Sequence, residues 1–372
     1  MAAENHQRRD DNHKAPRLSE LDPPPETTPA HIELSNPQTV AVDERPPISG
    51  EEVVVEPVPP EPAAIPEPKP EWLVLDPEDH SDPVAHEVTG FDKNLPNSWK
   101  LVAASIRGKA HAHKAKWRDD AFGLGWVDEW AILAVADGAG SARLSRVGAR
   151  IACDEAVATL KDLLFHFHLK KSRTKSPEPS DLQRLGTFLV QASRMARNGI
   201  RREAGIRECS ENDLHTTLLL AIHGPWKRGS LVGALQIGDG AIALYTGHST
   251  CTILGEADHG EYAGESLFLT SSFIDYESRV NLTVTEDLRC LAVMCDGVAD
   301  DFYPPHRKLI HLFNGDPIDN MKSKDGGIVR GIVHEALMDP QPAPSLLNWL
   351  HYEKRGSFDD RTLALLYRSD LP

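Results

Sequence analysis

Short apolar runs separated by Gly, Asp and His turns predict a series of β-strands from residue 98 onward. The first three strands are expected within the segments SWKLVAASIRG, DAFGLGWV and EWAILAVADG. Six more are expected within TTLLLAIHG, SLVGALQIG, AIALYTG, STCTILG, NLTVTE and LRCLAVMCDG. A last strand, TLALLYR, lies near the end of the sequence.

Helical spacing replaces this pattern in two long segments. Residues 143–168 repeat apolar side chains about every 3.6 positions, at Val147, Ile151, Ala152, Val157, Leu160 and Leu164. A second helix is expected over residues 181–204, after an exposed loop KKSRTKSPEPS, and shorter helices at about 306–313 and 325–338. This order of strands, long helices, more strands and a closing strand is α+β, with helices covering the outside of packed antiparallel sheets.

The segment before residue 90 differs in composition from the rest of the chain. Residues 1–89 hold 20 Asp and Glu against 6 Lys and Arg, whereas residues 90–372 hold 36 against 34. Runs such as EEVVVEPVPPEPAAIPEPKPEW are too poor in apolar residues to offset the entropy lost on ordering. We therefore expect a disordered acidic Pro/Glu-rich tail over residues 1–89 and a folded domain over 90–372. The alternative for WLVL (72–75) is docking on the folded domain or on a partner.

Charge and cysteine content argue against several classes of protein. The nearly neutral body lacks the basic surface of a nucleic-acid-binding protein, and no run approaches the ~20 apolar residues that cross a bilayer. The opening MAAENHQRRDDNHK has no apolar core of a secretory signal. Five scattered cysteines without a CxxC pair indicate reduced thiols. The sequence thus predicts a cytoplasmic protein that binds neither nucleic acid nor membrane.

Aspartates stand at the ends of apolar strands in five places. They are Asp119–Asp120 before AFGLGW, Asp137 after AILAVA, Asp239 in QIGDGAIAL, Asp296 after LAVMC, and Asp359–Asp360 before RTLALLY. Asp-Gly is also common in hairpin turns, so each site taken singly could be a turn. Five strand-end carboxylates without matching Arg partners favour a shared site for a hard divalent cation, Mg²⁺ or Mn²⁺.

The order of these motifs resembles a known enzyme family. RDDAF, VADGAGSA, TTLLLA, QIGDGAIAL, MCDGVADDF and FDDRT follow one another as in the metal-dependent protein phosphatases, the PPM or type 2C serine/threonine phosphatases. Gly108 and His111, shortly before the first acidic motif, resemble the compact bacterial branch of that family. The resemblance spans roughly residues 100–367 and implies a four-layer α-β-β-α sandwich of two antiparallel sheets flanked by helices.

The resemblance also implies a set of metal-binding positions. These are Asp120, Asp137, the carbonyl of Gly138, Asp239, Asp296 and Asp359. Asp359 corresponds to the acid of a closing D-N-x-T motif because Thr362 follows three residues later, and Asp360 takes the asparagine position. Asp239 corresponds to an acid linked to a third, looser metal. The implied cofactor is therefore two Mn²⁺ or Mg²⁺ ions per subunit, with a third at Asp239.

Two metal ions in such a site, about 4 Å apart, would lower the pKa of water and make hydroxide available for in-line attack on phosphorus. His111 and His113 are candidates for protonating the leaving alkoxide, against the alternative of hydrogen-bonding or surface histidines. The family often places an Arg before the first acidic motif to hold the substrate phosphate, and a direct count lands here on Ala115. We expect Lys114, Lys116 or His111 to replace it, against the alternative that both lysines lie on a solvated loop.

The predicted function is metal-dependent hydrolysis of phosphoserine and phosphothreonine in a protein substrate, alongside a cognate kinase. The alternative is a catalytically weak or inactive scaffold that keeps the fold, although no metal-site acid is clearly lost. Haloacid-dehalogenase-like enzymes need a second Asp two residues after the strand-end Asp, whereas Gly138-Ala139 follow Asp137. Removal of residues 1–89 is expected to leave hydrolysis of a small aryl phosphate intact.

Overall fold

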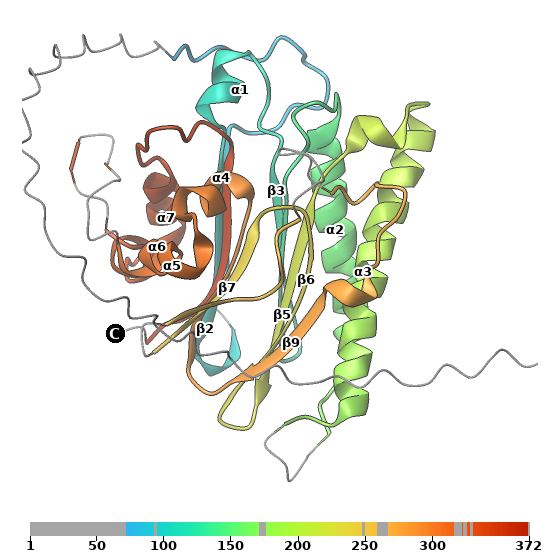
Figure 1. Cartoon of the computed structure of the whole chain (residues 1–372), viewed down its shortest axis with the longest axis vertical. Helices are drawn as coiled ribbons and strands as arrows, with labels where there is room; N and C mark the ends of the chain where they lie inside the picture. The colour runs from blue at the N-terminus through green and yellow to red at the C-terminus, as the bar shows by residue number, and fades with distance from the viewer. Residues whose placement is uncertain are drawn as a thin grey trace, which may run out of the picture. The chain divides into compact units, whose positions relative to one another are not determined.

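The computed structural model describes residues 72–92, 95–170, 176–247, 250–258, 267–315, 322, 326–327 and 330–370 (Figure 1). Residues 1–71, most of the predicted tail, lie outside this described part. Within it, two antiparallel β-sheets pack face to face, and helices cover their outer faces.

The first sheet has six strands in the order β1-β2-β11-β10-β7-β8, each antiparallel to its neighbours. In that order they are β1 (Glu87–Asp92), β2 (Trp99–Ile106), β11 (Arg361–Arg368), β10 (Leu288–Met294), β7 (Ala241–Thr246) and β8 (Cys251–Ile253). Met294 at the end of β10 pairs with Leu363 in β11 and with Ala241 in β7. The end of β10 therefore lies beside the starts of β11 and β7.

The second sheet has five antiparallel strands in the order β3-β4-β5-β6-β9. They are β3 (Ala121–Val127), β4 (Trp130–Ala136), β5 (Leu218–Trp226), β6 (Gly229–Ile237) and β9 (Val280–Thr285). Ala121 pairs with Ala136, so the start of β3 lies beside the end of β4.

Two long helices, α2 (Ser145–Leu164) and α3 (Pro179–Ile206), cover the outer face of the second sheet (Figure 1). Short helices lie on the outer side of the first sheet, where α7 packs on β1 and β2. The short helical elements are α1 (Lys109–His113), α4 (Asp296–Ala299), α5 (Pro305–Lys308), α6 (Ile310–Asn314), α7 (Pro342–Leu350), the π-helical turn η5 (Val333–Leu337) and the 3-10 turns η1 (Pro96–Ser98), η2 (Glu211–Leu214), η3 (Glu277–Arg279) and η4 (Asp300–Phe302). The layer order of helix, sheet, sheet, helix confirms the predicted four-layer sandwich.

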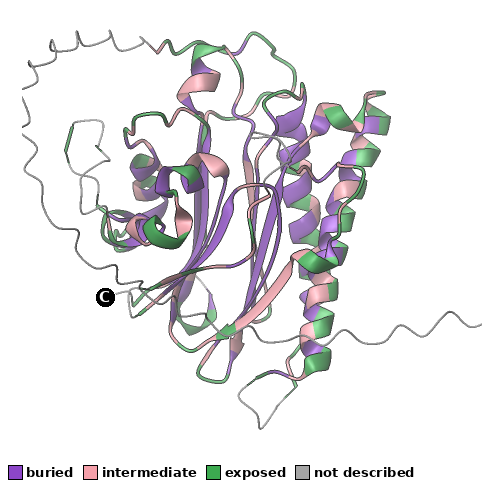
Figure 2. Ribbon diagram, viewed as in Figure 1, coloured by how far each residue is buried: buried purple, intermediate pink, exposed green. Residues whose placement is uncertain are grey.

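Two apolar cores hold these layers together. One lies between the sheets and includes buried residues of the short helices α6 and α7, and the other lies between the second sheet and α2–α3. Strand β4, WAILAVA, is buried at all seven positions because its two faces enter different cores. Leu133 and Val135 face the first sheet, whereas Ile132 and Ala134 face the helices. A strand covered on both faces reads as a continuous apolar run, and Figure 2 shows the buried strands between partly exposed helices.

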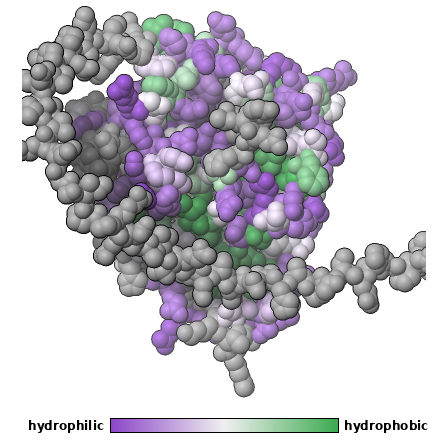
Figure 3. Space-filling model, viewed as in Figure 1, coloured by the Kyte–Doolittle hydropathy of each residue, from purple (hydrophilic) through white to green (hydrophobic). Residues whose placement is uncertain are grey.

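The outer surface is mainly hydrophilic in the view of Figure 3, with smaller apolar areas between polar ones. This pattern is expected when amphipathic helices turn their apolar sides toward a sheet. Among the described helices, none has both the length and the hydropathy that a membrane span requires.

Sequence-based prediction missed several elements, among them β1, α1, α4 and α7. The predicted boundary between residues 89 and 90 falls inside β1, because EVTGFD has little apolar pattern yet pairs along its whole length with β2. The helix expected at 306–313 is divided into α5 and α6, and the one expected at 325–338 lies partly outside the described residues. The ordered body therefore includes residues that the composition had grouped with the tail.

Candidate metal and phosphate site

The predicted acidic positions meet at one end of the two sheets because of strand register. Asp120 precedes β3 and Asp137 follows β4, whose ends are paired. Asp296 follows β10, Asp239 lies in the turn before β7, and Asp359 lies two residues before β11 begins. These three strand ends are neighbours in the first sheet. Residues far apart in sequence are thus brought to a common edge.

The carboxyl groups of this cluster influence one another strongly. Loss of water raises the pKa of Asp137 well above its usual range, and the charges of Asp120 and Asp296 act in the same direction. Burial and then the charge of Asp360 raise the pKa of Asp120 to about 8. Burial also raises the pKa of Asp296 to about 6. Such crowding costs free energy unless a cation compensates the charge.

Two oxygen atoms of the cluster are suited to a metal ion. Oδ1 of Asp120 and Oδ1 of Asp296 are buried and have no hydrogen-bond partner among the described residues. Buried carboxylate oxygens are normally paired, and hard oxygen donors are what Mg²⁺ and Mn²⁺ prefer. The donor set therefore fits the divalent cations that the sequence predicted.

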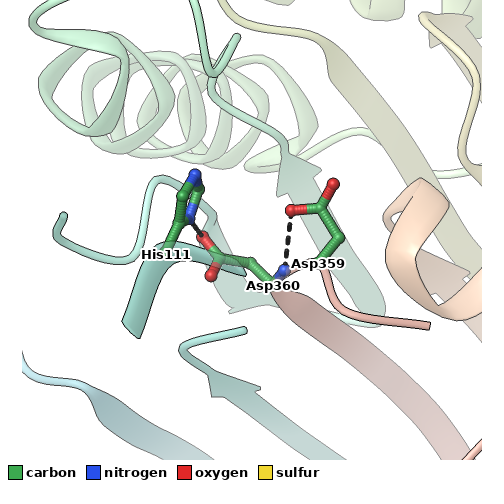
Figure 4. Close-up of side chains that lie close together, drawn as sticks. All are labelled: His111, Asp359 and Asp360. Carbon is green, nitrogen blue, oxygen red and sulfur yellow. Dashed lines mark hydrogen bonds and ion pairs between the residues drawn. The ribbon is translucent and has the colours of Figure 1, made fainter. Parts of the chain in front are cut away.

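The neighbouring carboxylates of Asp359 and Asp360 have different hydrogen-bond partners. The Asp360 carboxylate accepts hydrogen bonds from the amides of Gly108 and Asp119 (both 2.6 Å) and from Nδ1 of His111 (2.9 Å). Oδ1 of Asp359 accepts from the Asp360 amide (2.8 Å), and its charge adds to the raised pKa of Asp120 (Figure 4). Asp360 thus links the turn before β11 to the segment that contains Gly108, His111 and Asp119, whereas Asp359 faces the acidic cluster.

One potential ligand set in this region is already engaged internally. Atoms of His111, Asp359 and Asp360 lie within 4.8 Å of one another, which is a spacing that could hold a cation. His111 and Asp360 spend these atoms on the hydrogen bond to each other. We therefore assign the metal positions to the Asp120–Asp137–Asp296 cluster as a proposal, with Asp359 at its edge.

A buried hydrogen-bond chain holds Asp120. Thr362 Oγ1 donates to Oδ2 of Asp120 (2.6 Å) and accepts from Ser105 Oγ (2.6 Å). Ser105 in turn accepts from the guanidinium of Arg118, which can only donate. Thr362 belongs to a recognisable sequence motif, whereas Ser105 and Arg118 were not predicted. Their side chains meet only after β2, β3 and β11 are assembled, so no local pattern marks them.

The backbone around Asp137 is fixed by two threonines. Thr216 Oγ1 donates to the Asp137 carbonyl, and the Asp137 amide donates to Thr217 Oγ1 (both 2.8 Å). A Cβ at Gly138 would lie 2.7 Å from the Asp119 carbonyl oxygen, so only glycine allows the two acidic loops to approach this closely.

Asp239 lies at the edge of the cluster and is half-buried. Its charge contributes to the raised pKa of both Asp296 and Asp300. Asp301 differs, since its carboxylate accepts from Tyr352 (2.6 Å) and Ser357 (2.8 Å) in a buried network. The structure thus separates a cluster-facing Asp239 from an Asp301 that stabilises the fold.

His111 is held at the cluster by Asp360. Its Nδ1 bonds to that carboxylate and its Nε2 lies 3.7 Å from Oδ2 of Asp119. Burial alone would lower the pKa of His111, but the Asp360 hydrogen bond and the nearby carboxylate charges raise it to about 9. His111 is therefore a protonated donor at neutral pH. His113 is exposed, and its Nδ1 accepts from the amide of Leu73 (3.2 Å).

The two predicted phosphate-binding lysines lie on the exposed loop after α1. Lys114 is close enough to Asp359 for its charge to lower that group's otherwise raised pKa. Lys116 Nζ donates to the carbonyl of Gly140, three residues beyond Asp137 (2.9 Å). Ala115 between them has a φ of 53°, so the chain reverses there. Both ammonium groups therefore border the acidic cluster.

Known protein families, proteins and solved structures resemble this chain. A family model described as protein phosphatase 2C matches residues 107–316. Serine/threonine-protein phosphatase 3 of Escherichia coli (strain K12) is 31% identical over 210 residues, covering 54% of this chain and 74% of that protein. Among solved structures, the catalytic domain of PstP in complex with two manganese ions is 16% identical with a TM-score of 0.41, over 73% of this chain and 99% of that one. RsbX in complex with magnesium is 12% identical with a TM-score of 0.40, over 76% and 100%. Since the family model spans more than half of the sequence, this chain belongs to the protein phosphatase 2C family.

Proposed function

We propose that this protein is a metal-dependent phosphatase that hydrolyses phosphoserine and phosphothreonine in proteins. The observation that carries the proposal is the cluster of Asp120, Asp137 and Asp296, with two buried oxygens left without partners. The name of the similar Escherichia coli protein supports the same activity and substrate class. No acid of the predicted metal site is missing, which favours an active enzyme over an inactive scaffold.

Asp120, Asp137 and Asp296 would hold the cations, together with the Gly138 carbonyl, Asp359 and, for a third and looser ion, Asp239. When bound, Mn²⁺ or Mg²⁺ ions supply positive charge for the phosphoryl oxygens and lower the pKa of water. Thr216 and Thr217 fix the Asp137 backbone, and Thr362 fixes the Asp120 carboxylate, so these donors are in place before the substrate arrives.

The remaining steps belong to the basic side chains. Lys114 and Lys116 attract the substrate phosphate, each as a point charge on an exposed loop. His111, protonated at neutral pH, donates its proton to the departing serine or threonine oxygen. Asp360 keeps the imidazole oriented through Nδ1, which leaves Nε2–H as the donor.

The wider setting follows from this chemistry. A phosphoprotein phosphatase works on the product of a protein kinase, so a serine/threonine kinase in the same compartment is the expected functional partner. The cytoplasm of a bacterial cell is the compartment that we propose.

The test uses the full-length protein and a phosphoserine peptide. Activity should require added Mn²⁺ or Mg²⁺ and disappear with EDTA, and Asp137→Asn and Asp296→Asn should each lose at least about 99% of kcat. Asp162→Asn, on the exposed face of α2, is the matched control and should retain wild-type activity. Calorimetry should show weaker Mn²⁺ binding for the two site variants alone. Full activity in chelator, or unchanged Mn²⁺ binding, would exclude the proposed site.

A further inference from the structure

The segment from Trp72 to Asp82, here called the strap, crosses α1 before β1 begins. The Leu75 amide donates to the carbonyl of Ala112 (3.0 Å), and the Glu78 amide donates to that of Ala115 (3.2 Å). Figure 1 shows this blue segment passing α1 and continuing toward α2. These residues precede the domain boundary that composition suggested, yet they contact the part of the chain that carries His111.

At one end of the strap, the Trp72 side chain makes aromatic contacts beside the candidate metal and phosphate site. The Trp72 ring lies 4.5 Å from the Phe358 ring, centroid to centroid, and 5.5 Å edge-on from the His113 ring. Phe358 immediately precedes Asp359, and His113 lies two residues after His111. A single side chain therefore touches both segments that bring the histidine and the acidic cluster together.

The other end is fastened to the long helices. The Arg207 guanidinium grips the Asp82 carboxylate with two bonds of 2.7 and 2.8 Å. Buried Arg146 donates to the carbonyls of Ser81 (2.8 Å) and Asp82 (3.0 Å) and to the Asp79 carboxylate (3.0 Å). Charge-assisted bonds of this kind are the stronger ones in proteins. The strap is thus anchored to α2 and α3, not merely laid on the surface.

Helix α1 depends on these contacts. It has five residues, too few to be stable by its own hydrogen bonds. The carbonyl of Ala112 accepts from the strap, and the carbonyl of His111 accepts from Arg107 (3.2 Å), which also donates to the strap carbonyl of Leu75 (2.7 Å). The strap therefore contributes hydrogen bonds, directly and through Arg107, to the backbone segment that carries His111.

We propose that Trp72 of the strap is a positioning residue, which holds His111 in register with Phe358–Asp359 for proton donation to the leaving group. This rests on the proposed function, specifically on the acid role of His111. Misplacing a catalytic group by about 1 Å costs on the order of 100-fold in rate. Loss of the Trp72 ring should therefore affect the step that needs the proton.

The test compares two substrates in full-length variants. A phosphoserine peptide has an alkoxide leaving group that needs a proton, whereas p-nitrophenyl phosphate does not. Trp72→Ala should lower kcat on the peptide at least about tenfold and on p-nitrophenyl phosphate less than about twofold, with Mn²⁺ affinity unchanged. Trp72→Phe should restore most of the peptide activity. Val74→Ala is the matched control, because Val74 lies on the strap with 84% of its surface exposed.

A second variant acts at the far end of the strap. Asp82→Asn should give a smaller loss of kcat with the same preference for the peptide substrate, since it weakens the bonds to Arg207 without touching α1. Asn is chosen because it tolerates the φ of 45° at this position. Equal losses on both substrates for Trp72→Ala and Asp82→Asn would overturn the positioning role. His111→Ala is measured in parallel: if it shows the substrate pattern and the strap variants do not, the strap proposal fails while the proposed function stands.

Discussion

At the residue scale, the hydrogen bond to Asp360 is the interaction that suits His111 to act as an acid. Its carboxylate accepts three hydrogen bonds, one of them from Nδ1 of His111, which fixes the orientation of the imidazole. Both ring nitrogens then carry hydrogen at pH 7, because the pKa of His111 is about 9. The side chain thus suits an acid that gives up its proton only when a strongly basic alkoxide forms.

Replacing His111 with Ala should reduce kcat on a phosphoserine peptide by about 100-fold, within the usual range for a general acid. The loss on p-nitrophenyl phosphate should be much smaller, because p-nitrophenolate leaves without a proton. Steady-state kinetics on both substrates at saturating Mn²⁺ provide the measurement. Equal losses on the two would exclude the acid role.

The basic loop allows a second residue-scale prediction. Lys114→Ala should raise KM for a phosphorylated substrate by roughly 5-fold to 100-fold, as expected for a hydrogen bond to a charged group, and leave Mn²⁺ affinity almost unchanged. Calorimetry with Mn²⁺ and kinetics with the phosphoserine peptide separate these effects. A changed metal affinity with unchanged KM would place Lys114 outside the phosphate site.

Much of the candidate acidic cluster could be located from the sequence at this scale, and the residues that were missed share a common cause. Asp120, Asp137 and Asp296 each stand at the end of an apolar strand, and this position can be recognised from a single sequence. Arg118 and Ser105 act through contacts across strands, and nothing in their immediate neighbours indicates that role.

At the scale of elements, glycine marks where loops meet. A Cβ on Gly108 would overlap the backbone of Asp359 and Asp360, and one on Gly297 would overlap the Asp360 carbonyl. The loop before α1, the start of α4 and the turn before β11 therefore pack backbone to backbone. The close approach is what allows the Gly108 amide to reach the Asp360 carboxylate.

Gly108→Ala should consequently destabilise the protein by about 3 kcal/mol or more, since neither backbone can yield without breaking this hydrogen bond. Gly205→Ala is the control, because a Cβ there has open space, and Ala favours the last turn of α3. Thermal unfolding of both variants provides the comparison. Similar melting temperatures would contradict the close approach.

The elements that the sequence predicted well are those with a long apolar pattern. Strands β4 to β7 are nearly continuous apolar runs, and helices α2 and α3 have a helical repeat, because these elements enter an apolar core. Strand β1 and helix α1 lack such a pattern, since pairing with β2 and contact with the strap stabilise them from outside. Elements of this kind cannot be recognised before their partners are placed.

At the scale of the whole molecule, the metal-free protein carries an electrostatic cost at one end. An Asp in the unfolded chain titrates near 3.8, whereas burial raises the pKa of Asp120 to about 8 and that of Asp296 to about 6. Between these values the folded state binds more protons than the unfolded state, so its stability falls as pH rises.

The melting temperature in EDTA should therefore decrease from pH 5 to pH 8 relative to Asp137→Asn, in which one of the crowded acids is gone. Added Mn²⁺ should remove the difference in slope for the wild type by compensating the charge. Differential scanning fluorimetry across this range is sufficient. Parallel curves for wild type and variant without metal would contradict the proposed crowding.

The opposite dependence is expected from His223, which lies on β5 with its ring 4.5 Å from that of Trp99. Burial lowers its pKa from 6.5 to about 3, so the unfolded chain binds the proton first as pH falls. Stability should decline below about pH 6.5 by about 1.4 kcal/mol per pH unit from this group. His223→Gln should show a shallower acid limb in urea unfolding, and identical limbs would contradict this account.

The sharing of the acidic cluster between the two sheets has a mechanical consequence. Asp120 and Asp137 flank paired strands of one sheet, and Asp296 and Asp359 flank paired strands of the other. Apolar contact alone resists separation of two faces but permits them to slide. Cations held by both sets of carboxylates would cross-link the two sheets at one end of the sandwich. Movement of one sheet along the other would then strain metal–oxygen bonds. Loading with metal would then set the stiffness of the molecule as well as its chemistry.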